Sequence, residues 1–167
     1  ILYSGLGGTS DVCQILGKID KKIISKTNFL LVGPKKLKLG NVNFKNREKY
    51  VKTYKFLTIL YFLPVLKKII SVKPDIIFIH NYQIIPAILY KYLKSVNVKI
   101  IYVDHTPYTL KKYKDFIISK FFKNFIDIFV VLNNDSYQYF VNNININPKK
   151  VKIIPNAINK YFFTKTA

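Results

Sequence analysis

The sequence predicts an α/β fold: a Rossmann-like parallel sheet with helices on both of its faces. Three observations predict it. Short apolar runs alternate with segments of helical pattern, which is typical of βαβ units. The runs are continuously apolar, as in parallel strands buried on both faces. Several of them end in polar, small or kink-forming residues, so we expect their carboxyl ends to share one crevice, where open parallel sheets bind ligands.

The first expected elements are a strand at residues 1–3, a glycine-rich turn at 5–8, a helix at 10–19 and a strand at 29–32. Thr9, Ser10 or Asp11 can cap the helix, because their side-chain oxygens accept hydrogen bonds from free backbone N–H groups. The second strand is closed by Gly33-Pro34. The basic, polar residues 35–49 are expected to form a loop.

Residues 50–72 are expected to form a helix with an almost wholly apolar centre at 56–63 and lysines near its ends. The apolar stretch is too short to span a bilayer, and Pro64 interrupts it. Two interpretations stay open. The segment is either a buried crossover helix or a helix that lies in a membrane interface with its lysines reaching the headgroups.

Strands and helices alternate in the rest of the chain. The expected strands are residues 75–79, 98–103, 126–132 and 151–154, and the expected helices are 84–93, 111–125 and 135–142. Residues 75–79 form a continuous apolar run between Lys73-Pro74 and His80-Asn81, as expected of a central parallel strand.

The length and the net charge of the chain limit its possible domain count and partners. A chain of 167 residues is one domain by size. The net charge of +20 could indicate an anionic partner, but the codon bias of an A/T-rich genome would also raise the lysine content. With Arg47 as the only arginine, a nucleic-acid partner is disfavoured, since base readers use arginine for bidentate contacts. An anionic membrane surface stays open.

The single cysteine, Cys13, excludes an internal disulfide, and its place on the apolar side of the expected first helix favours a core position over a nucleophile. No signal-peptide pattern is visible. We therefore expect a cytoplasmic location, with peripheral attachment to the inner face of a membrane as an open addition.

Gly5, Gly7 and Gly8 lie between the first strand and the first helix. Glycine allows close backbone approach to a ligand, and a helix N-terminus suits a phosphate. The spacing is neither G-x-G-x-x-G nor a P-loop. An ordinary tight βα turn would use the same residues, so both interpretations stay open.

His80, followed by Asn81, and His105, preceded by Asp104, each follow a predicted strand. Neither histidine has metal-ligand spacing and there is no cysteine cluster, so we expect no metal. A structural role is the alternative for each ring. Otherwise, His105 could donate a hydrogen bond to a sugar hydroxyl or act as an acid or base. No carboxylate pair for glycoside hydrolysis and no G-x-S-x-G elbow is present.

Five segments occur in a fixed order along nearly the whole chain: Ser4-Gly-Leu-Gly-Gly-Thr9, Lys73-Pro-Asp-Ile-Ile-Phe-Ile-His-Asn81, Val103-Asp-His-Thr-Pro107, Ile128-Phe-Val-Val-Leu-Asn-Asn134 and Ile153-Ile-Pro-Asn-Ala-Ile-Asn159. Together they resemble the N-terminal domain of retaining glycosyltransferases of the GT-B fold, the group-1 and family-four type. The sequence departs from that pattern at residues 9–11, at Asn133 in place of serine, and at Ala157 and Asn159 in place of glycine and aspartate.

The resemblance implies a site between two Rossmann-like domains. Gly7, Gly8 and Thr9 would bind the donor diphosphate, and Asn156 would lie near the interdomain crevice on the donor side. His105 would be the catalytic residue beside the transferred sugar. The acceptor side would be lined by His80, Asn81 and Tyr82.

The implied function is transfer of a sugar, of hexosyltransferase type, from a nucleotide-diphosphate sugar to a saccharide or lipid-linked acceptor, with no cofactor or metal. The family's donor-binding half is not in this sequence, so we expect residues 1–167 to be one N-terminal domain, a fragment inactive by itself. A rival interpretation is a non-catalytic membrane-docking subunit that needs a separate donor-binding partner chain.

Overall fold

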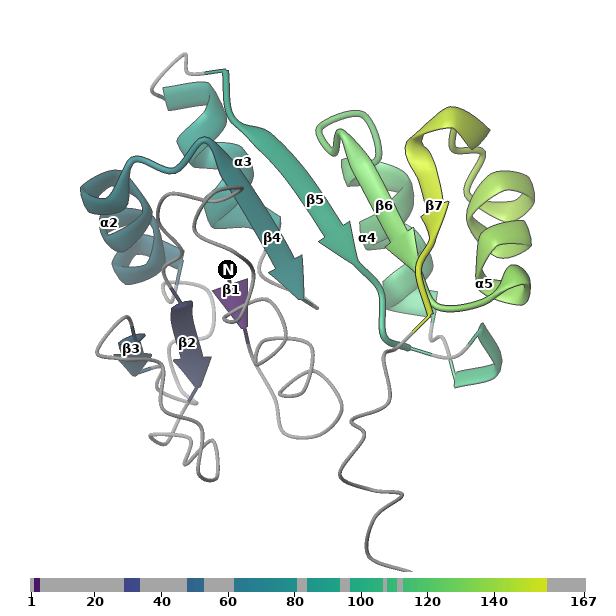
Figure 1. Cartoon of the computed structure of the whole chain (residues 1–167), viewed down its shortest axis with the longest axis horizontal. Coiled ribbons are helices and arrows are strands. Elements are labelled where there is room, and N and C mark those ends of the chain that lie inside the picture. The colour runs from purple at the N-terminus through teal and green to yellow at the C-terminus, as the bar shows by residue number, and fades with distance from the viewer. Residues whose placement is uncertain are drawn as a thin grey trace, which may run out of the picture.

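The computed structural model describes residues 2–3, 29–33, 48–52, 62–80, 84–93, 97–106, 108–110 and 113–155. In these ranges, one sheet contains seven strands: β1 (Leu2–Tyr3), β2 (Phe29–Gly33), β3 (Glu48–Lys52), β4 (Ile76–His80), β5 (Lys99–Val103), β6 (Ile128–Val131) and β7 (Val151–Ile153). The strand order is β3-β2-β1-β4-β5-β6-β7, and every neighbouring pair is parallel (Figure 1). The predicted parallel α/β class is confirmed.

The strand order reverses direction at β1. From β1 the chain moves outward through β2 and β3, and it then crosses back to place β4 on the other side of β1. Leu2 of β1 pairs with Leu30 of β2 and with Ile79 of β4. Open parallel sheets bind ligands at such a reversal, beyond the carboxyl ends of the strands. The carboxyl end of β4 is therefore the first place to look for a site.

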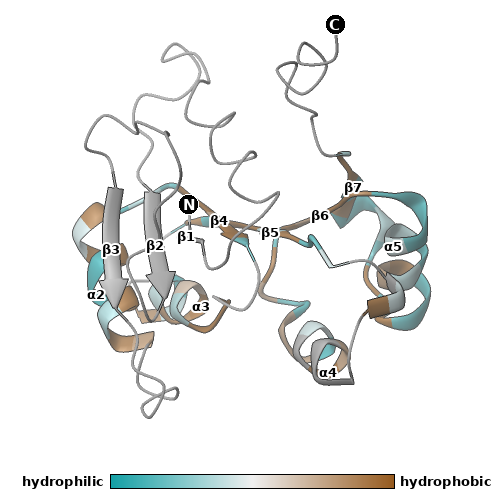
Figure 2. Ribbon diagram, turned by 90° about the horizontal axis from the view of Figure 1, so that it is seen from below, coloured by the Kyte–Doolittle hydropathy of each residue, from teal (hydrophilic) through white to brown (hydrophobic). Residues whose placement is uncertain are grey.

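The described helices are α2 (Phe62–Val72), α3 (Ile84–Leu93), α4 (Tyr113–Phe122) and α5 (Asn134–Gln138), which continues into a π-helical turn at Tyr139–Asn143. Short 3₁₀ turns occupy Tyr108–Leu110 and Pro148–Lys150. The four α-helices lie on the same side of the sheet (Figure 2). The described residues therefore confirm one of the two expected helix layers, the one on this face of the sheet. The helix predicted at 10–19 lies outside them.

The prediction was wrong at β3. Residues 48–49 were expected to be loop and residues 50–52 the start of a helix, but Glu48–Lys52 pairs with β2 along its whole length. The sequence Glu-Lys-Tyr-Val-Lys has no buried-strand pattern because it forms the edge of the sheet. Edge strands commonly carry charged side chains, which discourage pairing with another chain.

Helix α2 is the crossover helix of the fold. Val65, Leu66 and Ile69 are buried in the core that it shares with α3 and the sheet. Pro64 is the third residue of the helix and does not interrupt it, because proline is tolerated in a first turn, where its missing N–H has no intrahelical partner. The described part of the predicted helix supports the crossover interpretation. Residues 53–61 lie outside it.

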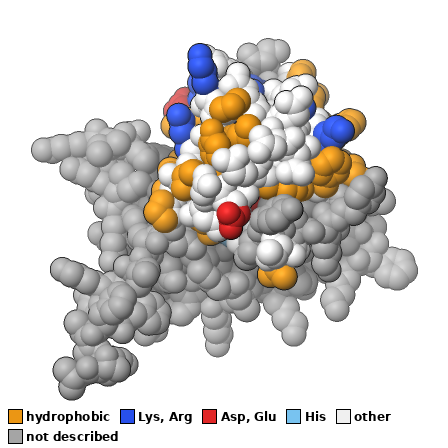
Figure 3. Space-filling model, turned by 90° about the vertical axis from the view of Figure 1, so that its right-hand side faces the viewer, with side chains coloured by type: hydrophobic (Ala, Val, Ile, Leu, Met, Phe, Trp, Pro, Cys, Tyr) orange, Lys and Arg blue, Asp and Glu red, His pale blue; other side chains and the backbone are white. Residues whose placement is uncertain are grey.

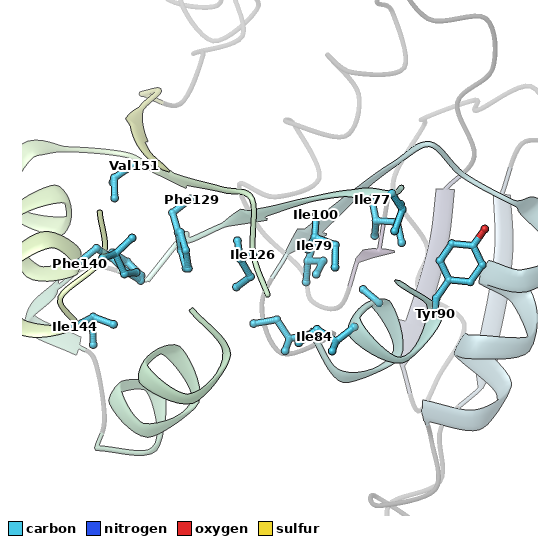
Figure 4. Packing of buried hydrophobic residues seen from close by; sticks show 14 of the residues in the cluster. Ile77, Ile79, Ile84, Tyr90, Ile100, Ile126, Phe129, Phe140, Ile144 and Val151 are labelled. Carbon is cyan, nitrogen blue, oxygen red and sulfur yellow. The ribbon is translucent and has the colours of Figure 1, made fainter. Parts of the chain in front are cut away.

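The core lies between the sheet and these helices, as Figure 4 shows for its labelled side chains. Ile77 and Ile79 of β4 and Ile100 of β5 point toward Ile84 of α3, while Phe129 of β6 packs against Phe140, with 5.4 Å between the ring centroids. Since side chains alternate along a strand, the neighbours of Ile77 and Ile79, namely Phe78 and His80, belong to the opposite face.

The last strand leaves apolar side chains at the surface. Ile153 and Ile154, at the end of β7, are exposed. Figure 3 views the molecule from the α5 side, where hydrophobic and lysine side chains of the described residues reach the surface together.

Candidate functional site

His80 is the last residue of β4, beside the reversal of strand order. Its backbone pairs with Val103 of β5, and the preceding residue, Ile79, pairs with Leu2 of β1. A continuous apolar strand carries His80 into the interior, and its side chain has 0% exposed surface. Sequence analysis placed His80 just after a strand. The structure extends that strand by one residue and buries the ring.

His105 lies two residues beyond the partner of His80. Because β4 and β5 are parallel and in register, the chain that leaves β5 passes the end of β4, and the two rings meet. His80 Nδ1 lies 2.8 Å from His105 Nε2. The structure thus brings together the only two histidines of the chain, which are 25 residues apart in sequence.

The two rings meet edge to edge. Their centroids are 5.1 Å apart and their planes differ by 21°. The centroid separation exceeds the 2.8 Å between the nitrogens by about the sum of the two ring radii, so the contacting atoms lie nearly on the line between the centroids. This is the geometry of an in-plane N–H···N hydrogen bond and not of face-to-face stacking.

Asp104 holds the turn that presents His105. Its backbone N–H donates to the carbonyl oxygen of Val130 on β6, at 2.9 Å, and its Oδ1 accepts a hydrogen bond from the Thr106 N–H, at 3.2 Å. The carboxylate is buried. Sequence reasoning gave Asp104 no role. The available signal was the Asp-x-Thr spacing, in which an aspartate bonds the backbone two residues later and forms an Asx turn.

Both histidines are held neutral. Burial, together with a smaller effect of the neighbouring His105, lowers the pKa of His80 from 6.5 to about 3. Burial also lowers the pKa of His105, against the opposing attraction of the Asp104 carboxylate. Loss of water around the rings disfavours the charged form. Near neutral pH the pair can donate and accept hydrogen bonds without carrying charge.

Asn133, which stands where the family pattern has serine, caps α5. Its side-chain Oδ1 accepts a hydrogen bond from the Ser136 N–H, at 2.9 Å. Asparagine and serine are both favoured at this position, because each supplies an oxygen to a free N–H group of the first turn. The departure from the pattern therefore preserves the local structure after β6.

The other predicted site residues lie outside the described residues: Gly7, Gly8, Thr9, Asn81, Tyr82 and Asn156. Their assignments stay predictions. Two described strand ends do lead toward them, since β1 ends at Tyr3 and β4 ends at His80.

No group of three or more histidine, cysteine, aspartate or glutamate side chains that could hold a metal ion occurs among the described residues. Within the same part of the chain, no helix has both the length and the apolar character needed to cross a bilayer.

Two solved structures share this fold. A glycosyltransferase from Rickettsia africae superposes with a TM-score of 0.66 at 15% sequence identity, over 98% of this chain and 44% of that one. The Anabaena protein HepE (Alr3699), solved in complex with UDP and glucose, gives a TM-score of 0.59 at 13% identity, over 95% of this chain and 44% of that one. The chain therefore spans less than half the length of each.

A comparison with curated proteins found no match in sequence. A match to a family was found: the sequence profile of Glycosyltransferase Family 4 matches residues 33–160. That range covers most of the chain, including β3 to β7 and both histidines, and it agrees with the fold of the two solved structures. The chain belongs to Glycosyltransferase Family 4.

Proposed function

We propose that the chain is the acceptor-side domain of a hexosyltransferase that uses a nucleotide-diphosphate sugar and glycosylates a saccharide or lipid-linked acceptor. The observation that carries the proposal is the contact between the buried His80 and the partly buried His105 at the carboxyl ends of β4 and β5, beside the reversal of strand order. Membership of the family supports sugar transfer, and HepE, a structural neighbour, was solved with UDP and glucose.

In this proposal His105 is the catalytic residue that contacts the transferred sugar. A neutral imidazole can donate to a sugar hydroxyl, and a group already oriented by its neighbours stabilises the transition state at little reorganisation cost. Gly7, Gly8 and Thr9, with Asn156, would bind the donor diphosphate. Asn81 and Tyr82, which follow the buried His80 at the end of β4, would line the acceptor side. We propose no metal and no cofactor.

The departing diphosphate must be neutralised by groups that the His pair cannot supply, since both rings are neutral. We therefore propose that turnover needs a donor-binding domain or a partner chain, and that residues 1–167 alone do not transfer sugar. The 44% coverage of both solved neighbours supports this proposal.

The test compares donor-dependent transfer by residues 1–167 alone with transfer by the same residues joined to a donor-binding domain. His105→Ala is measured in the joined protein. We expect turnover only in the joined protein and a loss in kcat of about 100-fold or more for the variant, as for the removal of one preorganised donor. Wild-type kcat in the folded variant would overturn the role of His105. Sugar transfer by residues 1–167 alone would overturn the need for a partner.

A second candidate function is membrane docking, and an aromatic ridge favours it. The ridge consists of Tyr92, at the end of α3, and Phe121, Phe122 and Phe125, in and after α4, whose rings contact one another in a chain. Tyr92 and Phe121 are 63% and 71% exposed. Exposed aromatic side chains on a protein of net charge +20 fit the interface of an anionic bilayer.

We propose that this ridge contacts the inner face of a membrane, either in the active enzyme or in a non-catalytic subunit. Co-sedimentation with vesicles of anionic lipid tests it. Phe121→Ser should weaken binding several-fold, whereas Leu63→Ser, an exposed apolar residue on α2, should not. Equal binding by both variants would contradict a docking role for the ridge.

A further inference from the structure

His80 and His105 share one hydrogen bond, and that bond constrains where both ring protons lie. A neutral imidazole carries one proton, so one of its nitrogens donates and the other accepts. The 2.8 Å contact between His80 Nδ1 and His105 Nε2 therefore admits two arrangements. Either His80 Nδ1 donates and His105 keeps its proton on Nδ1, or His105 Nε2 donates and His80 keeps its proton on Nε2.

The buried Nε2 of His80 distinguishes the two arrangements. Within the described residues this atom has no hydrogen-bond partner, and the ring has no exposed surface. If His105 donated, His80 would carry an N–H at this atom, a buried donor without an acceptor, which proteins rarely contain. If His80 donates, Nε2 keeps only a lone pair, and its one ring proton is already used in the contact with His105.

We propose that His80 is a positioning residue: it donates from Nδ1 to His105 Nε2, and it thereby fixes the His105 proton on Nδ1. Nearly coplanar rings that meet edge to edge are aligned for this bond. The proposal rests on the proposed function, in which His105 contacts the sugar. It adds that His105 contacts substrate as a hydrogen-bond donor through Nδ1, while its Nε2 is occupied.

This assignment differs from the role that the family resemblance gave to His80. A side chain with no exposed surface, bonded to a second ring, acts on substrate through that ring. The same arrangement recurs where a second group sets the tautomer of a functional histidine by bonding the nitrogen that does not react.

Nuclear magnetic resonance reads the proton positions directly. Long-range ¹H–¹⁵N correlation of the ring nitrogens, on the uniformly labelled 167-residue chain near pH 7.5, distinguishes a protonated nitrogen from a bare one. The chain contains two histidines, so only two ring systems are present, and a single His80 variant assigns both. We expect both rings to be protonated on Nδ1. A native spectrum with the His105 proton on Nε2 would overturn the proposal.

Two variants test whether His80 sets the His105 tautomer. His80→Leu removes the donor, and we expect His105 to change from one form to a mixture of both tautomers. His80→Asn keeps an amide donor near the position of Nδ1, and we expect it to keep the Nδ1 form. Circular dichroism confirms that each variant is folded. If His80→Leu does not fold, the native spectrum and the Asn variant still decide. Unchanged His105 signals in a folded Leu variant would overturn the proposal.

These spectra require neither donor nor acceptor. A failed tautomer assignment would leave sugar transfer untouched, whereas wild-type kcat in His105→Ala would remove the proposed role of His105 without changing the spectra. The two failures are therefore distinguishable.

Discussion

Lys91 on α3 and Asp127, just before β6, form an ion pair with 2.9 Å between Nζ and Oδ2. The same carboxylate oxygen accepts a hydrogen bond from the backbone N–H of Ile100 on β5, at 2.8 Å. One carboxylate thus connects a helix and two strands at the amino ends of β5 and β6, the edge opposite to the histidine pair. Burial disfavours its charge, but the Ile100 and Lys91 bonds outweigh burial and lower the Asp127 pKa.

Asp127→Ala should reduce the free energy of unfolding by about 1–3 kcal/mol, because it leaves the Ile100 N–H without its acceptor. Lys91→Met should cost less than about 1 kcal/mol, since the ion pair is partly exposed and keeps the backbone bond. Urea denaturation at pH 7 measures both. A larger loss for Lys91→Met would show that the ion pair, and not the backbone bond, is the main contribution.

Stability should fall as the pH is lowered from about 6.5 toward 4.5. In the unfolded chain the histidines titrate near 6.5. In the folded chain the pKa of His80 is about 3 and that of His105 is also lowered, with Asp104 opposing. The unfolded state therefore binds more protons in this window than the folded state, in which the His80 ring stays neutral. Each such proton costs about 1.4 kcal/mol per pH unit.

The control for this pH dependence is His80→Leu, which removes one of the two titrating rings. Its free energy of unfolding, measured by urea denaturation at pH 7.5, 6.5, 5.5 and 4.5, should decline less steeply than that of the native chain. Parallel curves for the two proteins would contradict the lowered pKa of His80. The lowered pKa of Asp127 keeps its carboxylate charged in the folded chain across this window.

Phe140→Ala should reduce the free energy of unfolding by about 3–5 kcal/mol, the usual cost of removing a buried aromatic ring. Phe140 has no exposed surface and packs against Phe129 and Tyr139. Phe121→Ala deletes the same ring from an exposed position, so its effect should stay within about 0.5 kcal/mol. Similar losses at the two positions would mean that Phe121 packs against the fold.

Lys73→Gly should stabilise the chain by about 0.5–1 kcal/mol. Lys73 follows α2 with a φ of 49°, and its N–H bonds the carbonyl oxygen of Ile69, as in a helix end closed by a left-handed residue. Glycine adopts that conformation without a steric penalty. Asn145, with a φ of 59°, is the matched control: asparagine tolerates this region, so Asn145→Gly should gain less in thermal denaturation.

The sequence was sufficient for the buried elements. Helix α3 has the predicted bounds, Ile84–Leu93, and β4 to β7 differ from prediction by at most two residues at an end. Continuous apolar runs specify such elements, because burial on both faces leaves little choice of structure. Glu48–Lys52 was missed for the converse reason. It is the first strand in the order and pairs with β2 alone, so its charged composition resembles that of a loop.

The site was predictable in its residues but not in its contacts. Each histidine could be placed at a strand end from the local pattern. That His80 and His105 meet depends on the register of β4 against β5, which pairs His80 with Val103 and which no local pattern contains. Sequence reasoning also missed the complete burial of His80 and the turn held by Asp104, although the Asp-x-Thr spacing was a local signal for that turn.

The central position of β1 has a consequence for synthesis on the ribosome. Leu2 is made well before Ile79, which is one of its two strand partners. The middle of the sheet therefore cannot close before β4 is made, and β1 keeps one unpaired edge until β4 has left the exit tunnel. Nascent chains in which β4 is still inside the tunnel should therefore be the ones that most need a chaperone.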